Sequence, residues 1–241
     1  MDRTAAIVTG HSRGLGEAIA HHLLSRGVRV LGISRRGNPG LAKRHAALAE
    51  LQIDLADALV VAIDAAALGK HFRDCDTALL VNNAGVLQPA GPLETQGPDA
   101  VTRAIVVNVA APLALCASFV AASAHARDRR IVHISSGAGR NAYAGWSVYC
   151  ASKAALDHHA RAVALDKTPN LRICAVAPGV IDTDMQAEVR NTSEDKFPDR
   201  ERFVELKREG RLLSADRAGH NVVEVLLSES FGREAVIDLR N

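Results

Sequence analysis

Short runs of β-branched residues alternate with longer stretches rich in Ala and Leu along the chain. Apolar residues recur at helical spacing in the longer stretches, whereas the short runs have the composition of buried strands. This alternation is typical of βαβ units, and it predicts an α/β fold with a doubly wound parallel sheet of about seven strands. The expected strands are residues 5–9, 28–34, 51–54, 78–82, 130–135, 171–176 and 235–239, and the expected helices are 15–26, 57–72, 99–126, 149–166 and 216–228.

The size and composition favour one folded domain. The chain has 241 residues, of which 48% are hydrophobic and 23% charged, and it contains no repeat, low-complexity tract or linker. Residues 1–241 are therefore expected to form a single domain. One segment interrupts the alternation, because sixteen of the thirty residues at 182–211 are Asp, Glu, Lys or Arg. We expect a mobile, lid-like excursion there, with room for a short helix pair; a solvated surface loop is the alternative.

The charge balance and the N-terminal residues exclude several classes of partner. Lys and Arg number 29 against 27 Asp and Glu, a net charge of +2 that does not indicate a nucleic-acid or membrane surface. We expect no apolar run to reach the ~18 residues of a membrane span. The N-terminal residues also lack the pattern of a secretory signal. The protein is therefore expected to be cytoplasmic, without nucleic-acid or membrane partners.

The cysteines and histidines show no metal-binding pattern. No two of the four cysteines form a C-x-x-C pair, which disfavours structural zinc and a thioredoxin-like motif. The adjacent histidine pairs at 21–22 and 158–159 would point about 100° apart on a helix. We expect reduced thiols and no metal site.

A glycine-rich turn, TGHSRGLG at residues 9–16, follows the first expected strand and leads into a helix. Ligands of parallel sheets bind at the carboxyl ends of strands, where glycines let backbone N–H groups approach a pyrophosphate. The spacing is G-x-x-x-G-x-G, and for this fragment alone a turn that merely allows tight packing is an equal alternative. A P-loop is excluded because no Gly-Lys-Ser/Thr follows. The predicted contacts to a dinucleotide are Gly10, Ser12, Arg13, Gly14, Leu15 and Gly16.

Basic residues at the end of the second expected strand favour a phosphorylated cofactor. Folds that prefer NAD place an acidic residue there, on the adenosine ribose. Here the strand ends in Ser34, Arg35 and Arg36, and Arg13 stands in the glycine turn. Because guanidinium groups bind phosphate bidentately, these residues predict NADPH, held through its 2′-phosphate. Solvated arginines are the alternative.

Small and polar residues also follow the fourth and fifth expected strands, as NNAG at 82–85 and SSG at 135–137. Tyr149 stands thirteen residues after Ser136, and Lys153 stands four residues after Tyr149 on an expected helix. Side chains four apart share a helix face, so the ammonium is expected near the phenol. Its charge should lower the pKa of Tyr149 and make the phenol a proton donor.

In this order, the motifs resemble those of the short-chain dehydrogenase/reductase family over essentially the whole chain. The matching stretches are TGHSRGLG, DL at 54–55, NNAG, VVNVAAP, IVHISSGAG, YCASK and PGVIDT. The resemblance implies a Rossmann-type fold and an NADPH-dependent reductase in which Tyr149 is the general acid and Lys153 tunes its pKa and binds ribose. It also implies that Ser136 donates to the carbonyl oxygen and that Asn108 holds a water. The further cofactor contacts that it implies are Asp54, Leu55, Asn83, Ala84, Gly85, Pro178, Gly179, Ile181 and Thr183.

The second half of the chain is similar to the sepiapterin reductases and to the bacterial reductases of benzil and other 1,2-dicarbonyls. The stretches GWSVYCASKAALD, PGVIDTDMQAEVR, FVELKREGRLLS and AVID carry this similarity. It implies a 1,2-dicarbonyl substrate and a role for Asp238, which matches an aspartate that anchors pterin; a solvated carboxylate is the alternative.

Two further residues, Trp146 and Met185, are expected to border the substrate pocket, with a purely structural tryptophan as the alternative. The family also suggests a homodimer or homotetramer formed through the expected helices 99–126 and 149–166. The rival functions are a broad aldehyde/ketone or ketoacyl thioester reductase and a nucleotide-binding protein without catalysis.

Overall fold

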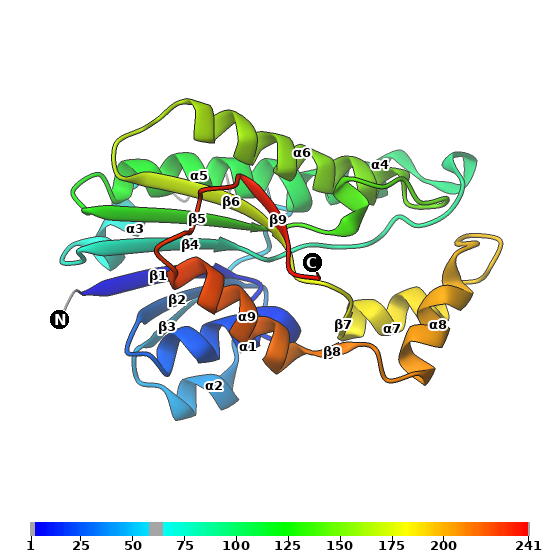
Figure 1. Cartoon of the computed structure of the whole chain (residues 1–241), viewed down its shortest axis with the longest axis horizontal. Helices are drawn as coiled ribbons and strands as arrows, with labels where there is room; N and C mark the ends of the chain where they lie inside the picture. The colour runs from blue at the N-terminus through cyan, green and yellow to red at the C-terminus, as the bar shows by residue number, and fades with distance from the viewer. Residues whose placement is uncertain (1–2, 58–64, 241) are drawn as a thin grey trace.

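Seven parallel strands form one sheet in the order β3-β2-β1-β4-β5-β6-β9 (Figure 1). The computed structural model describes residues 3–57 and 65–240. The strands are β1 (Thr4–Thr9), β2 (Arg29–Ser34), β3 (Leu48–Gln52), β4 (Thr77–Asn82), β5 (Asp128–Ile134), β6 (Leu171–Ala177) and β9 (Val236–Asp238). The order reverses between β1 and β4, which confirms the doubly wound α/β sheet. Ligands of such sheets bind beyond the carboxyl ends of the strands at this switch point.

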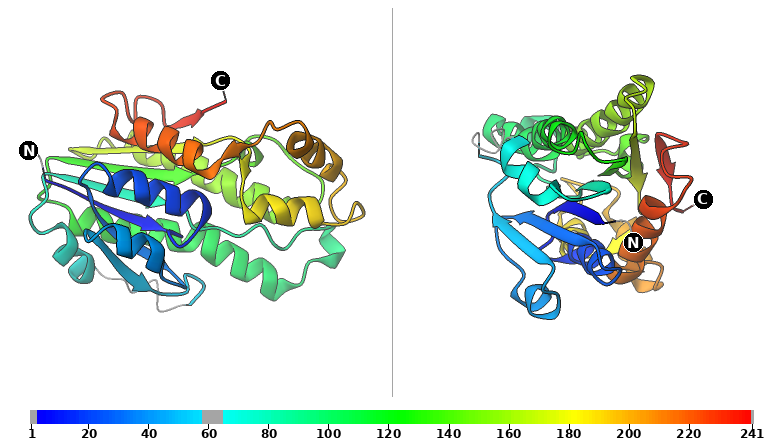
Figure 2. Two further views of the ribbon diagram at one scale, coloured as in Figure 1. Left: turned by 90° about the horizontal axis from the view of Figure 1, so that it is seen from below. Right: turned by 90° about the vertical axis from the view of Figure 1, so that its left-hand side faces the viewer.

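Helices cover both faces of the sheet (Figure 2). They are α1 (Gly14–Leu24), α2 (Pro39–Arg44), α3 (Ala65–Phe72), α4 (Pro98–Ile105), α5 (Ala111–Ala122), α6 (Ser147–Leu165), α7 (Asp184–Asn191), α8 (Arg200–Arg208) and α9 (Ala215–Leu227). Apolar residues of α3, α5 and α6 pack on one face, and those of α1, α2 and α9 pack on the other.

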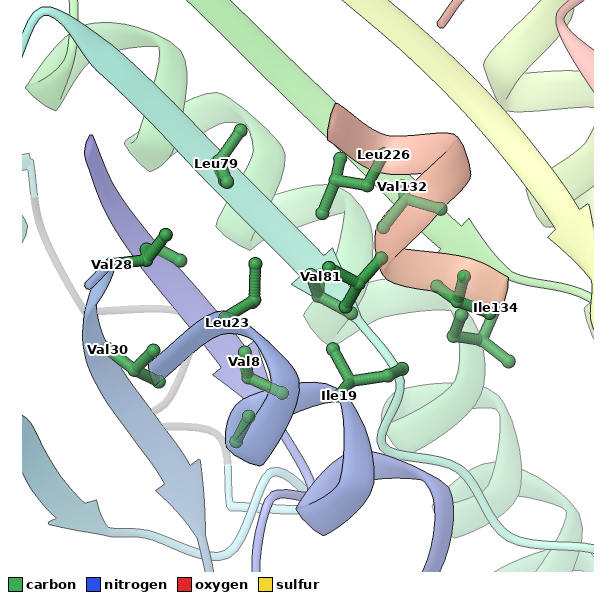
Figure 3. Packing of buried hydrophobic residues seen from close by; sticks show 14 of the residues in the cluster. Val8, Ile19, Leu23, Val28, Val30, Leu79, Val81, Val132, Ile134 and Leu226 are labelled. Atoms are coloured by element: carbon green, nitrogen blue, oxygen red, sulfur yellow. The ribbon is translucent and has the colours of Figure 1, made fainter. Parts of the chain in front are cut away.

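Strand residues alternate between two hydrophobic clusters. Ile7 points to the cluster under α5, whereas its neighbour Val8 points to the cluster under α1, and both are fully buried. Figure 3 shows the second cluster, in which Ile19 and Leu23 of α1 lie over Val8. Burying such side chains contributes about 1.5–3 kcal/mol each. This packing fixes the carboxyl ends of the strands, where the candidate site lies.

The expected helix 99–126 is interrupted. Helix α4 runs into a π-helical turn, Val106–Ala110, and only then into α5. Pro112 explains the break, because proline has no N–H to offer to the Asn108 carbonyl four residues earlier.

The same stretch, Pro98–Ala122, is long and apolar enough to span a membrane by length and composition alone, and 44% of its most apolar part is buried in the protein. The expectation that no apolar run reaches that length was therefore wrong. Leu115 and Phe119 of this stretch lie in the core against α3 and the sheet. A helix that packs in a protein core can have the same composition as a membrane span.

Other differences lie at the edges of the sheet. Strand β3 begins at Leu48 rather than at residue 51, and the short helix α2 was not expected. Of the expected helix 57–72, the structure shows α3, while residues 58–64 lie outside the described part of the chain. Strands β7 (Ile181–Asp182) and β8 (Leu213–Ser214) form a small second sheet that the sequence did not predict.

The charged segment 182–211 contains α7 and α8, which lie beyond the carboxyl ends of the large sheet (Figure 1). Its few apolar residues are not solvated. Val189, Phe197 and Phe203 are buried in a third cluster together with Trp146 and Tyr149. The segment is thus packed on the protein by an aromatic contact, while its charged residues face outward.

Candidate active site

A pocket of about 790 Å³ opens at the carboxyl ends of the central strands. Most of the predicted site residues line it. From the cofactor set these are Gly10, Ser12, Arg13, Gly14, Leu15, Ser34, Arg35, Arg36, Asp54, Leu55, Asn83, Ala84, Gly85, Pro178, Gly179, Ile181 and Thr183. From the catalytic and substrate sets they are Ser136, Tyr149, Lys153, Trp146 and Met185. Three predicted residues, Gly16, Asn108 and Asp238, do not line the pocket.

The glycine turn has the geometry of a close backbone approach. Gly10 and Gly14 have positive φ angles of 71° and 58°, which favour glycine. A Cβ atom on Gly16 would lie 2.2 Å from the Gly10 carbonyl oxygen and 2.4 Å from Nδ2 of Asn83. Gly16 therefore allows α1 to pack against the turn, whereas Gly10 and Gly14 line the pocket. Packing also restricts Gly10, since a Cβ there would lie 2.9 Å from Nδ2 of Asn83. The binding role of the turn stays a prediction.

Basic side chains surround the end of the pocket at which the adenosine of a dinucleotide is expected. Arg13 forms an ion pair with Asp184, and Arg103 donates to Asp54 over 2.7 Å. The N–H of Ala56, and then the charges of Arg103 and Arg35, hold the pKa of Asp54 below its usual range. Acidic side chains at this end are thus neutralised by arginines.

A buried histidine in the glycine turn went unnoticed in the sequence. His11 is fully buried, and its Nε2 lies 2.7 Å from Oε1 of Glu50, while its Nδ1 lies 3.2 Å from the hydroxyl of Ser34. Glu50 also accepts from the N–H of Asn38 over 2.5 Å. The carboxylate of Glu50, on β3, is therefore already hydrogen-bonded to other residues of the protein. Gly32 makes room for the ring, because a Cβ there would lie 2.4 Å from it.

Tyr149 and Lys153 project from one face of α6 into the pocket. Nζ of Lys153 lies 5.6 Å from the centre of the Tyr149 ring and donates to the Ile134 carbonyl over 2.8 Å. Burial raises the pKa of Tyr149 to about 12, against a smaller opposite effect of the Ser136 side chain. The pKa of Tyr149 is therefore raised rather than lowered as expected, and the causes of this shift are burial, Ser136 and Cys150 rather than Lys153. Burial also lowers the pKa of Lys153 to about 8, and the charge of Asp157 acts the other way.

Asn108 lies in the π-helical turn behind the catalytic pair. Its Nδ2 donates to the Val86 carbonyl over 2.8 Å and to the Ser152 hydroxyl over 3.2 Å, and its Oδ1 accepts from the Val86 N–H over 2.8 Å. The side chain thus fastens the loop after β4. The predicted contact of Asn108 with a water stays a prediction.

The substrate end of the pocket is aromatic. The Trp146 ring stacks on Phe197 at 4.2 Å with parallel planes, and its edge meets Tyr149 at 5.6 Å. Phe203 and Met185 line the same wall. Trp146 is only 5% exposed, so it is both a core residue and a pocket residue, two roles that the sequence analysis had treated as alternatives.

Asp238 does not line this pocket, and its contact with substrate stays a prediction. Its carboxylate accepts from Nη2 of Arg140 over 3.0 Å and from Nε of Arg240 over 2.8 Å. These guanidinium groups, Arg240 foremost, lower the pKa of Asp238 to about 2. Arg240, which the sequence analysis overlooked, lines the pocket instead.

Two polar networks behind the pocket also went unnoticed. Asp157 stands one turn after Lys153, is 1% exposed, and accepts from Ser135 and from Nη1 of Arg140. Asp157 lies on the apolar face of the expected helix 149–166, and an acidic residue at such a position is the signal that could have identified this network.

The second network joins Cys116, His133 and His159, whose ligand atoms lie within 4.8 Å of one another. Nε2 of His133 lies 3.1 Å from Nδ1 of His159, and Nδ2 of Asn82 contacts Nδ1 of His133 at 3.2 Å. Burial lowers the pKa of His133 to about 3 and raises that of Cys116 to about 12, so both are neutral. These residues come from different elements, which hid their proximity in the sequence.

Known proteins share this sequence pattern and this fold. The family model described as short chain dehydrogenase matches residues 4–194. A benzil reductase ((S)-benzoin forming) from Bacillus cereus is 36% identical over 96% of this chain and 97% of its own length. Sepiapterin reductase from Bos taurus is 31% identical over 99% of this chain and 95% of its own.

Among solved structures, a short-chain dehydrogenase/reductase from Burkholderia vietnamiensis is 46% identical, with a TM-score of 0.72 over 100% of this chain and 98% of that one. The structure adds two observations to these matches. Its sheet has the doubly wound strand order, and its pocket combines a glycine turn with the Tyr149–Lys153 pair. The chain therefore belongs to the short-chain dehydrogenase/reductase family of oxidoreductases, in the branch of the benzil and sepiapterin reductases.

Proposed function

We propose that this oxidoreductase is an NADPH-dependent carbonyl reductase whose preferred substrates are 1,2-dicarbonyl compounds such as benzil or sepiapterin. The observation that carries this proposal is one pocket that joins a glycine turn, a buried Tyr149–Lys153 pair and an aromatic wall. The proposal also draws on the relatives named above, which are benzil and sepiapterin reductases.

The cofactor end supports NADPH. Gly10 and Gly14 bring the backbone close to the pocket, and Arg13, Arg35 and Arg36 line it where a 2′-phosphate would bind. The NADPH, when bound, supplies the hydride. The carboxylate of Glu50 is bound to His11, so it need not face the 2′-phosphate and repel it.

The catalytic end supports proton donation by Tyr149. A phenol with a pKa near 12 stays protonated at neutral pH, so it can hold a carbonyl oxygen by a hydrogen bond and then give up its proton. Ser136 borders the same space and would donate to that oxygen. Lys153 places a positive charge next to the ring and would favour the phenolate that forms.

The aromatic wall supports a planar substrate. Trp146, Phe203 and Met185 form an apolar surface that excludes water from the reacting carbonyl. We propose that segment 182–211, which supplies Met185 and Phe203, acts as the lid of a single domain.

The location and assembly belong to the same proposal. Four unpaired thiols are typical of a cytoplasmic protein. Leu165 at the end of α6 is 78% exposed and Ile105 of α4 is 36% exposed, which supports a homodimer or homotetramer through these helices. Mass photometry should give a multiple of the 25.6 kDa chain mass; a mass of one chain would contradict the assembly.

The experiment that tests the activity measures NADPH oxidation with a panel of substrates. Benzil, 1-phenyl-1,2-propanedione and sepiapterin should be reduced with higher kcat/KM than simple ketones and acetoacetyl thioesters. Faster turnover of the thioester than of every dicarbonyl would contradict the substrate class and favour a ketoacyl reductase. No oxidation with any substrate would favour a nucleotide-binding protein without catalysis.

A further inference from the structure

The side chain of Arg240 reaches over the substrate end of the pocket from the C-terminal segment. A methyl group placed on Gly137 would lie 3.2 Å from Nη2 of Arg240 and 3.8 Å from Cζ and Nη1. A methyl group on Gly179 would lie 3.5 Å from its Cγ. The two glycines therefore make room for this arginine. They belong to the loop of Ser136 and to the loop after β6, which both line the pocket.

A chain of ion pairs holds Arg240 in this position. Its Nε and Nη2 donate to the two oxygens of Asp238 over 2.8 and 2.5 Å. Asp238 also accepts from Nη2 of Arg140 over 3.0 Å, and Nη1 of Arg140 donates to buried Asp157 over 3.1 Å. A bidentate pair fixes the plane of a guanidinium group. Arg240 is thus oriented by contacts that extend back to the helix of Lys153.

The same contacts leave part of the guanidinium group free. They use two of its five N–H groups, and within residues 3–57 and 65–240 no acceptor is hydrogen-bonded to Nη1. The charge of Arg240 is balanced by Asp238, so the free N–H groups suit a neutral oxygen. The hydroxyl-bearing Tyr143 also lies close enough to affect Arg240 and lines the pocket.

We propose that Arg240 forms an oxygen subsite, in which its free N–H groups bind a carbonyl oxygen on the carbon next to the reacting carbonyl. Asp238 and Arg140 are positioning residues for this subsite. The subsite gives the pocket a means of selecting 1,2-dicarbonyls that does not depend on their chemical reactivity. This inference rests on the proposed function and adds the residue that recognises the second oxygen.

The test compares Arg240→Ala with the wild type on matched substrates. Propiophenone and 1-phenylpropan-2-one each lack one carbonyl of 1-phenyl-1,2-propanedione. Losing a hydrogen bond from a charged donor should lower kcat/KM for the dione about ten- to hundred-fold. The two monoketones should change by less than about three-fold, because they lack the second oxygen. Arg233→Ala, an exposed arginine of the same segment, is the control and should change neither.

Two further variants separate recognition from misfolding. Guanidinium ion added to Arg240→Ala should restore part of the dione activity and none of the monoketone activity. Asp238→Asn should lose less dione activity than Arg240→Ala, because it loosens the guanidinium group without removing it. The thermal unfolding midpoint and the Kd for NADPH should stay close to the wild-type values in both.

The outcomes also separate the inference from the proposed function. Equal losses on all three substrates, or no loss on any, would overturn the subsite while leaving the proposed function intact. A wild-type enzyme that reduces the monoketones as well as the dione would overturn the proposed substrate class, and the subsite with it.

Discussion

Lys153 is a buried residue of the pocket whose pKa lies close to neutral pH. Burial lowers its pKa to about 8, and the charge of Asp157 is what opposes that shift. The ammonium form is the one that favours the developing phenolate of Tyr149. The two groups therefore act together only below the pKa of the lysine.

The pH profile should show this titration. For reduction at limiting substrate, kcat/KM should fall as the pH rises through about 8, because Lys153 then loses its proton. Asp157→Asn removes the charge that raises the pKa, so the falling limb should move to lower pH. The profile of this variant would contradict the assignment if its falling limb stayed in place or moved to higher pH.

The arginines at the adenosine end should determine cofactor preference. Arg35→Asp replaces a phosphate-binding cation with an acid, which repels the 2′-phosphate and can accept from ribose hydroxyls. Each lost charge-assisted bond costs roughly 1.5–3 kcal/mol, so the NADPH preference should fall at least about ten-fold. Specificity constants for both cofactors measure the change, and kcat at saturating NADPH should stay nearly constant. An unchanged preference would exclude Arg35 from phosphate binding.

Two glycine substitutions should act in opposite directions. Gly16→Ala forces a methyl group against the Gly10 carbonyl, so it should weaken NADPH binding and lower the unfolding free energy. Gly69 lies inside α3, and no atom of residues 3–57 and 65–240 lies within 4 Å of a Cβ placed there, so Gly69→Ala should stabilise the protein by about 0.4–1 kcal/mol. Denaturant titrations and NADPH titrations measure both effects. A Gly16→Ala protein as stable as Gly69→Ala would contradict the close packing of the turn.

An aromatic stack is central among the contacts that attach the segment of α7 and α8 to the pocket. Phe197 lies between the two helices, is fully buried, and stacks on Trp146. The backbone of the segment also approaches the backbone before α6 closely there, since a Cβ on Gly145 would lie 2.0 Å from the Lys196 carbonyl oxygen. These contacts at the centre of the segment help to fix its position on the pocket.

Phe197→Ala should therefore detach the segment from the pocket. Removing a buried phenylalanine costs about 3–5 kcal/mol, shared between global stability and local opening of this segment. We expect a higher KM for benzil and a Kd for NADPH that changes little, because most of the predicted cofactor residues lie on other loops. Glu194→Ala on the exposed part of the segment is the control. An unchanged KM for benzil would show that the stack does not shape the substrate site.

The elements that the sequence predicted well are those with a strong burial pattern. Strands β1, β4 and β6 are buried along nearly their whole length and lie where the apolar runs predicted them. Strand β3 lies at the sheet edge, alternates poorly and is half-exposed, so its predicted start was three residues late. The division between α4 and α5 depends on Pro112, whose effect the helical periodicity concealed.

At the scale of the whole molecule, the sheet order brings distant segments to one pocket. The glycine turn after β1 and the loop after β4 meet at the switch point, and the sequence motifs predicted that meeting. The ion pair of Asp238 with Arg140 could not be predicted in this way. Arg140 is 98 residues away from Asp238 in the chain, and only the packing of β9 beside β6 shows that the pair forms.

In the proposed mechanism, Tyr149 is the proton donor to a carbonyl held beside NADPH. The most direct measurement is kcat/KM for 1-phenyl-1,2-propanedione with Tyr149→Phe, together with the Kd for NADPH. Since proton donation contributes about 10²–10⁴-fold, kcat/KM should fall by at least about 100-fold while the Kd stays within about three-fold of wild type. Activity within about ten-fold of wild type would contradict the proposed mechanism.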